Sequence, residues 1–441
     1  MTHDMTRGPI LPQLIKFTVP LILGNLLQLT YNAVDSMVVG SFAGKEALAA
    51  VGTSNPLMTL ILLFTNGICL GAGILVSFHF GAGDNRKLQR QVSTGMLAGI
   101  VFSVLTGLGA GLFARPIMEL MQVDEVILDS AVHYLRVIMC GLVFSFVYNY
   151  VASVLRAMGD SKSPLIFLSV SSVCNILGDL LFVAILKMGV MGAAVSTVLC
   201  EALSAVLCLI YISRNVPVLR LGKGWLVFDR SQLKTTLSYG IVSALQQSTV
   251  QMGKLAVQAF VNSLGVTSTA AFNATNRIDD FAMIPEQNIA HAASSIMAQN
   301  VGAGETKRVS QSFGWGMLLE GVFGIYAAVL LYAWASPILR LFSKDPEVIR
   351  EGVRFIHLIA FMYPVPAITN GIQGYFRGIG KLRVTLVSSM INMAARVLSC
   401  WILLYRMHGD FAAIPWSYLA GWAAMMIYEI PVFIKTKKGG Q

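Results

Sequence analysis

Long apolar stretches separated by short polar segments recur along the whole chain. Each has roughly 20 residues or more, enough for an α-helix to cross a hydrocarbon core of about 30 Å. Lipid offers no partners to backbone polar groups, so such stretches are expected as transmembrane helices. We predict twelve, at about 13–40, 47–80, 92–114, 131–154, 164–187, 190–213, 233–264, 267–300, 310–335, 352–374, 384–406 and 412–434. The pattern therefore predicts an all-α membrane protein.

Composition agrees with this pattern. Hydrophobic residues make up 55% of the 441 residues and charged ones 12%, against roughly 25% charged in soluble domains. The six cysteines fall inside apolar stretches without paired spacing, so neither a disulfide framework nor a structural metal site is expected. The sequence shows no HExxH, GxSxG or Walker motif, so an enzyme is not expected.

Basic residues alternate along the loops. Counted from the N-terminus, alternate loops hold 20 Lys and Arg, whereas the opposite loops and adjoining helix ends hold nine. This is the positive-inside pattern, which predicts an even number of crossings and two cytoplasmic termini in a plasma (inner) membrane. The net charge of +10 is thus explained by topology, and no nucleic-acid partner is expected.

The chain repeats itself at a shift of 221 residues without a gap. The shift aligns Gly81–Gly83 with Gly302–Gly304, and Arg156 and Gly159 with Arg377 and Gly380. Six crossings per repeat put both halves in the membrane in the same direction, the parallel arrangement of secondary transporters. We therefore predict an N-lobe at 1–213, a cytoplasmic linker at 214–232 and a C-lobe at 233–441, which rock about a central cavity.

Ionisable residues inside the apolar stretches point to function, because each costs at least about 2.5–3.5 kcal/mol at mid-bilayer. The acids are Asp35, Asp179, Glu201, Asp279, Asp280, Glu286, Glu320 and Glu429. In the first half they have no basic partner within the membrane. Asp179 shares a helix face with Asn175, and with Asp35 and Thr197 they offer an oxygen-rich site for a hard cation or a proton. Glu201 and Glu429 are left without a role.

The second half mixes both signs of charge. Lys254 lies on one helical stripe with Gln247, and it could meet Asp279 or Glu286, while Arg277 could pair with Asp280. A polar network is therefore predicted from Lys254, Gln247, Asp279, Asp280, Glu286 and Arg396. Two interpretations stay open: a static set of ion pairs between helices, or pairs that open on protonation or substrate binding. The shift of 221 places Ala256, Arg396 and Cys400 opposite Asp35, Asn175 and Asp179, so the acidic site is not duplicated.

Ordered motifs along nearly the whole chain resemble those of the multidrug and toxic compound extrusion (MATE) transporters. They include Asn32-Ala-Val-Asp35, Phe80-Gly-Ala-Gly83, Arg156-Ala-Met-Gly159-Asp160, Asn175 with Asp179, and Arg377-Gly-Ile-Gly380. The resemblance implies two six-helix lobes that export organic cations or drug-like amphiphiles, driven by inward Na⁺ or H⁺. It also implies cation coupling at Asp35, Asn175, Asp179 and Thr197, and bending of the first helix at Pro20.

The resulting prediction is a cation-coupled antiporter, expected as a monomer, with no cofactor besides the transported Na⁺ or H⁺. Two alternative families stay open. A major-facilitator transporter also has two parallel six-helix halves and a loop like Gly81–Arg90, and a lipid-linked precursor flippase of the same superfamily would have about fourteen helices and a cationic cavity. Some family members carry a carboxylate in the seventh helix, where this chain has Gln247 and Lys254. This departure argues against a second sodium site in the C-lobe.

Overall fold

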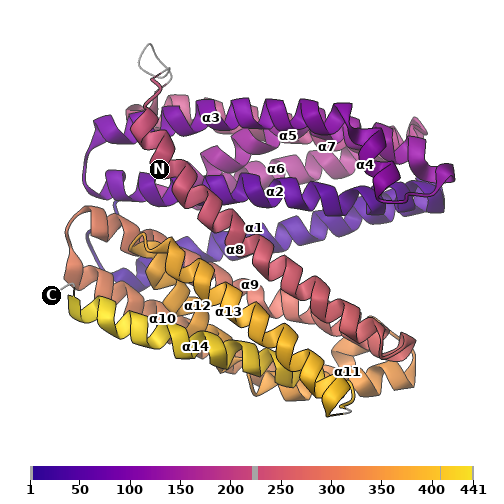
Figure 1. Ribbon diagram of the computed structural model, residues 1–441. Coiled ribbons are helices and arrows are strands. Elements are labelled where there is room, and N and C mark those ends of the chain that lie inside the picture. Colours follow the sequence, from indigo (N-terminus) through magenta and orange to yellow (C-terminus); the bar gives the residue numbers. More distant parts are fainter. Residues whose placement is uncertain (1–2, 221–226, 408, 440–441) are drawn as a thin grey trace. The chain divides into compact units, whose positions relative to one another are not determined.

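The computed structural model describes residues 3–220, 227–407 and 409–439, and within these ranges all regular elements are helices (Figure 1). The predicted linker at 214–232 includes residues 221–226, which lie outside the described residues. On either side of that gap, α7 ends at Asn215, a short 3₁₀ turn spans Pro217–Leu219, and α8 begins at Arg230.

The first half consists of long helices joined by tight turns. They are α1 (Ile10–Val38), α2 (Gly44–Gly81), α3 (Asn85–Leu112), the short α4 (Ala114–Leu120), α5 (Glu125–Ala157), α6 (Lys162–Asp179) and α7 (Gly189–Asn215). Two π-helical turns interrupt the α-helices, η1 at Val39–Ala43 and η2 at Leu180–Ile185.

The second half follows the same order. Its helices are α8 (Arg230–Asn262), α9 (Val266–Gly302), α10 (Thr306–Leu339), α11 (Pro346–Ala360), α12 (Pro364–Gly378), α13 (Leu382–Trp401) and α14 (Ala413–Gly439), with a π-helical turn η4 at Ile402–Arg406. α11 and α12 form one span bent by 54°.

Among the described helices, twelve spans have the length to cross a bilayer, as predicted, when the short α4 is left out and α11 and α12 are taken as one span. By hydropathy and length, eight stretches of the described residues pass as membrane spans, and one of them, Ile10–Gly81, contains both α1 and α2. The bent pair α11–α12 adds another. The remaining two are α8 and α9, with 33 and 37 residues, in which Gln, Ser, Thr and charged residues lower the mean hydropathy.

Backbone conformation confirms the internal repeat. Glycines with positive φ occur in pairs at the predicted shift: Gly44 and Gly265 (89° and 102°), Gly83 and Gly304 (67° and 75°), Gly159 and Gly380 (83° and 76°). Glycine enters this left-handed region without a steric penalty, so it ends the same helices in each half. The halves differ where α5 is continuous but its counterpart is split into α11 and α12, because Pro364 cannot continue the preceding helix.

Contacts divide the chain into two compact units, which we name by their larger part. The N-unit is Met1–Arg7, Lys16–Ala244 and Gly302–Gly304, and the C-unit is Gly8–Ile15, Leu245–Val301 and Glu305–Gln441. The boundaries therefore fall inside α1 and α8. Each unit has its own buried core, with Phe146 and Tyr150 in the N-unit and Phe355 and Tyr363 in the C-unit.

In each unit the basic loops gather at one end. In the N-unit, the His3 amide donates to the Met158 carbonyl at 3.0 Å, and Gln89 bonds Val218 at 2.6 Å. In the same loop region Asp160 caps α6. Burial opposes its ionisation, but bonds from the Ser163 amide and hydroxyl and from the Tyr211 hydroxyl hold the pKa of Asp160 below its usual value. In the C-unit, Lys381 reaches Thr436 at 3.3 Å.

Candidate ion-coupling site

Two carboxyl groups meet in the interior of the N-unit. Asp179 is the last residue of α6, immediately before η2, and its side chain is 0% exposed. Asp35 lies near the end of α1 and is half-buried. The two groups are close enough to share a hydrogen bond when one of them carries a proton. π-Helical turns are frequent at functional sites, and such a turn shifts the helix face on which the following residues lie.

Asn175 is placed one turn before Asp179, as its spacing predicts, and it is 4% exposed. Its amide donates to the Ser196 hydroxyl at 3.2 Å, and that hydroxyl donates to the Asn175 carbonyl at 3.1 Å. The hydroxyl from α7 that joins this cluster is therefore Ser196, while Thr197 is the half-buried residue that follows it. Sequence reasoning missed Ser196, although it shares a buried face of small residues with Gly192 and Cys200.

Uncompensated negative charge distinguishes this cluster. Oδ1 of Asp35 and both carboxyl oxygens of Asp179 are buried, and the groups that approach Asp179 are the neutral Ser196 hydroxyl and the acidic Asp35. Within the described ranges neither aspartate forms an ion pair. Tyr134 of α5, 5% exposed, lies within electrostatic range of both aspartates and of Glu201. A buried carboxylate pair of this kind is stable only if a proton or another cation neutralises it.

The two carboxyl groups suit a proton or a single monovalent cation. Among the residues that the structure describes, no group of three or more His, Cys, Asp or Glu side chains is arranged to hold a metal ion. The remaining polar atoms nearby are the amide and hydroxyl of Asn175 and Ser196. Pro20 lies within the uninterrupted helix α1, so bending there stays a prediction.

The predicted C-lobe network separates into smaller sets. Lys254 pairs with Asp280 at 3.3 Å, in place of the expected partners Asp279 or Glu286, and Asp280 takes Lys254 in place of Arg277. The Tyr363 hydroxyl donates to Asp279 at 2.6 Å. Gln247 lies half-buried in α8, one residue after the bonded Gln246.

Two members of that network lie deep in the C-unit. The Arg396 guanidinium lies over the Tyr418 ring at 3.9 Å from its centroid and at 5.5 Å from that of Trp422. Glu286 is 0% exposed and approaches Gly324, where an added Cβ would lie 3.2 Å from its Oε1. Only Lys254 and Asp280 among the six predicted residues therefore form an ion pair in the described part of the chain.

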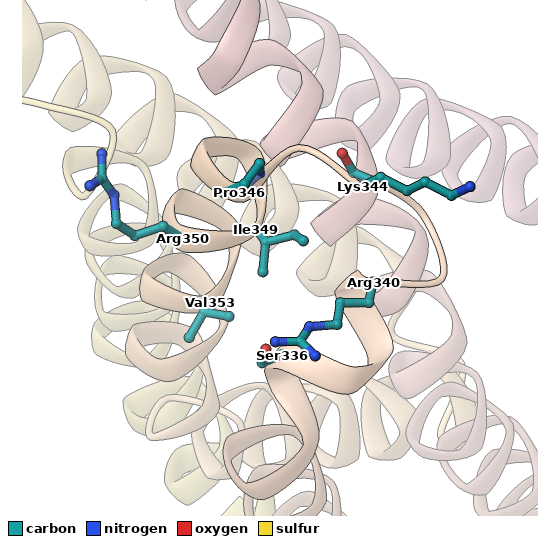
Figure 2. Close-up of a pocket in the computed structure, with 8 residues that line it drawn as sticks. Ser336, Arg340, Lys344, Pro346, Ile349, Arg350 and Val353 are labelled. Carbon is teal, nitrogen blue, oxygen red and sulfur yellow. The ribbon is translucent and has the colours of Figure 1, made fainter.

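A cavity of about 640 Å³ lies elsewhere, between the end of α10 and the start of α11. Figure 2 shows Arg340 beside Ser336 on one side, with Ile349 and Val353 of α11 on the other. Its charged lining residues, Arg340, Lys344 and Arg350, are all basic. None of the predicted site residues lines this cavity, so it is distinct from the acidic cluster.

The chain is 29% identical over 415 residues to the probable multidrug resistance protein YpnP of Bacillus subtilis, covering 93% of this chain and 90% of that protein. It is 25% identical over 411 residues to a FAD transporter of Shewanella oneidensis, covering 89% and 88%. A crystal structure of MATE in the bent conformation matches with a TM-score of 0.90 over 99% of this chain and 98% of that one, at 18% identity.

The sequence model of the MatE family matches residues 20–181 and 243–402, one segment in each repeat. The match excludes the major-facilitator alternative, and the twelve-helix fold disagrees with the fourteen helices expected of the flippase. Taken with the duplicated helices and the curated relatives, it shows that this chain is a multi-pass membrane protein of the MATE family of multidrug transporters.

Proposed function

We propose that this chain is a cation-coupled antiporter that exports organic cations or drug-like amphiphiles by alternating access. The observation that carries the proposal is the buried pair of Asp35 and Asp179, which has no basic partner among the described residues. Inward movement of Na⁺ or H⁺ supplies the free energy, and the pair is where the coupling ion binds.

The chemistry follows from charge. Two carboxylates side by side in a medium of low dielectric constant cannot both stay ionised without a counter-charge. Binding one proton or one Na⁺ removes the penalty, so the bound and empty forms of the N-unit differ in free energy. An ion that enters from one side and leaves to the other can therefore bias which side the transporter opens to.

The location of the charged loops supports an orientation. Because the basic loops of each unit gather at one end, we place that end and both termini in the cytoplasm, in a plasma membrane. We propose that the transporter works as a monomer. The name of the Shewanella relative introduces an anionic cargo as the competing class of substrate, and the acidic site disfavours it electrostatically.

The decisive experiment is transport in proteoliposomes with Na⁺ and pH gradients imposed separately. Wild type should export a cationic dye under one of the two gradients, and Asp35→Asn and Asp179→Asn should each lose at least about tenfold in rate, the factor that about 1.4 kcal/mol of lost binding produces. Glu46→Gln is the matched control, because it removes an exposed carboxylate in α2. Normal gradient-driven transport by Asp35→Asn would reject the coupling role, and uptake of FAD but no cation would reject the substrate class.

A further inference from the structure

The C-unit holds a second set of buried acids that the coupling site does not use. Glu286 of α9, Glu320 of α10 and Glu429 of α14 are each 0% exposed, and all six carboxyl oxygens lie buried without a hydrogen-bond donor. They come from three different helices of one unit. Neutral donors approach two of these acids, Asn370 at Glu286 and Gln373 with Ser388 at Glu429, and none of these donors carries a compensating charge. Three ionised groups in such surroundings would be strongly destabilising.

One guanidinium faces this set. Arg377, near the end of α12, is 8% exposed, and its buried Nε has no hydrogen-bond partner. It lies within electrostatic range of both Glu320 and Glu429, and Glu320 in turn lies within range of Glu286. A single positive charge balances one of the three carboxylates. The other two remain uncharged only if each binds a proton.

The fold leaves room for these carboxyl groups. An added Cβ at Gly324 of α10 would lie 3.2 Å from Oε1 of Glu286. At Gly371 of α12 the added atom would first meet the sulfur of Met317 and would lie 3.2 Å from Oε2 of Glu320. Gly324 therefore borders Glu286 directly, and Gly371 makes room for Met317 together with Glu320.

The acids form a series along the C-unit. Measured from the helix ends at the basic-loop side, Glu429 lies about 15 Å into α14, Glu320 about 21 Å into α10 and Glu286 about 24 Å into α9, at 1.5 Å per residue. Asp279, within electrostatic range of Glu286, lies about 35 Å from the same end of α9. It precedes the exposed Asp280–Lys254 pair, so the series reaches accessible surface.

Polar side chains continue the series at the other end. Gln373 of α12 bonds Ser388 and Ser389 of α13 at 3.3 and 3.2 Å, and Gln246 of α8 bonds both Gln373 and Ser389. Two bases act on Asp279 in the described part of the chain: Lys254 of α8 and Arg396 of α13, whose guanidinium lies over Tyr418. Amide and hydroxyl groups of this kind bond a carboxyl group in either protonation state.

We propose that Glu286, Glu320 and Glu429, arranged around Arg377, form a proton-binding site of the C-unit. Protons enter and leave through Asp279 and the exposed Asp280. The ligand is H⁺ and not a metal ion, because no three acidic, His or Cys side chains in the described ranges converge at metal-binding distances. The site is separate from Asp35 and Asp179 and does not depend on their coupling role.

The test counts protons. Full-length protein carrying Asp35→Asn and Asp179→Asn is the parent, and its proton release is measured with an indicator dye in weak buffer as the pH is raised from about 6 to about 9. Exposed carboxyl groups titrate near about 4 and contribute nothing in this range. Adding Glu320→Gln or Glu429→Gln should lower the release by about one proton per molecule, and Glu347→Gln, an exposed acid at the start of α11, should leave it unchanged.

Unchanged release in both Glu320→Gln and Glu429→Gln would overturn the proposal. If one variant fails to fold, the other and Glu286→Gln decide. Because the parent already lacks both N-unit aspartates, failure of the coupling site cannot mimic or hide this result. Conversely, loss of the C-unit protons leaves the transport experiment on Asp35 unaffected as a test of the proposed function.

Discussion

The two repeats share a backbone and bury opposite chemistry at the same positions. At the shift of 221, Glu320 and Gly371 of the C-unit correspond to Gly99 and Tyr150 of the N-unit. In the C-unit the glycine on α12 leaves room for Met317 and Glu320 of α10, whereas in the N-unit the glycine on α3 lies under the ring of Phe146. The same helix crossing is thus packed by a thioether and a carboxyl group in one unit and by aromatic rings in the other.

At a second pair of equivalent positions, it is the N-unit that buries the acid and the C-unit that does not. At the shift of 221, Cys400 stands at the position of Asp179, Ala256 at that of Asp35, and Arg396, stacked on Tyr418, at that of Asn175. The π-helical turns η2 and η4 follow at equivalent places in both. A duplicated backbone therefore fixes where a polar group can be buried, and single side chains decide which unit carries acid there.

The largest effect is expected from giving the N-unit the residue of its counterpart. Asp179→Cys removes the buried carboxyl group and should lower gradient-driven transport by at least about tenfold. Cys400→Ala is the matched variant in the C-unit and should stay within about twofold, because that free, buried thiol carries no charge and its polar neighbour is the Ser417 hydroxyl. Transport rates in proteoliposomes check both, and equal losses in the two variants would contradict the division of roles.

The second-largest effect is expected on stability, from disturbing the packing of α3 against α5. Gly99→Ala would drive a methyl group into the Phe146 ring, so we expect a loss of about 1–3 kcal/mol in unfolding free energy. Gly109→Ala, on the same helix with nothing within 4 Å of the added atom, should be neutral or stabilising by up to about 1 kcal/mol. Thermal unfolding in detergent measures both. A stable Gly99→Ala would mean that α3 and α5 can move apart easily.

Sequence alone could propose the candidate site at Asp35 and Asp179, because a charged residue in an apolar stretch is visible without a fold. Asp35 and Asp179 are rare residues in their surroundings, and the helical spacing placed Asn175 beside them. Ser196 escaped because serine is common in membrane helices and only the approach of α7 to α6 selects it from its neighbours.

In the C-unit, the partners of the charged residues could not be predicted from sequence, because those partners also depend on how helices approach one another. Lys254 was expected to meet Asp279 or Glu286, but it pairs with Asp280, on the same helix α9 as those two acids. Which acid a base meets is set by helix rotation, and periodicity does not fix that rotation in a chain that is apolar on most faces. No role could be predicted for Glu429, because its neighbour Arg377 lies on another helix. In the sequence, Arg377 belongs to the loop motif Arg377-Gly-Ile-Gly380. The fold class and the repeat, by contrast, were recoverable because they depend on stretches and spacings and on no single contact.

A smaller loss of stability is expected when Arg396 can no longer stack on Tyr418. Arg396→Lys keeps the charge but loses the planar contact with Tyr418, and we expect about 1 kcal/mol lower stability. Arg406→Lys is the control, because its guanidinium lies 5.7 Å from the Trp401 centroid and its side chain is exposed. Unfolding midpoints of the two variants should therefore differ. Equal midpoints would show that burial of charge, and not the ring, fixes Arg396.

The smallest effect concerns the one pair of opposite charges that the C-unit network retains. Lys254 and Asp280 are 51% and 58% exposed at the side chain, so water screens their attraction and a coupling energy of about 0.2–1 kcal/mol is expected. A double-mutant cycle with Lys254→Gln and Asp280→Asn measures it from unfolding free energies, and added salt should lower it further because exposed charges are screened. A coupling well above this range, insensitive to salt, would mean that the pair is dehydrated in the membrane-embedded protein. Surface exposure would then be a poor guide to which charges this duplicated fold can bury, and the contrast between an acidic N-unit pair and a neutralised C-unit pair would lose its physical basis.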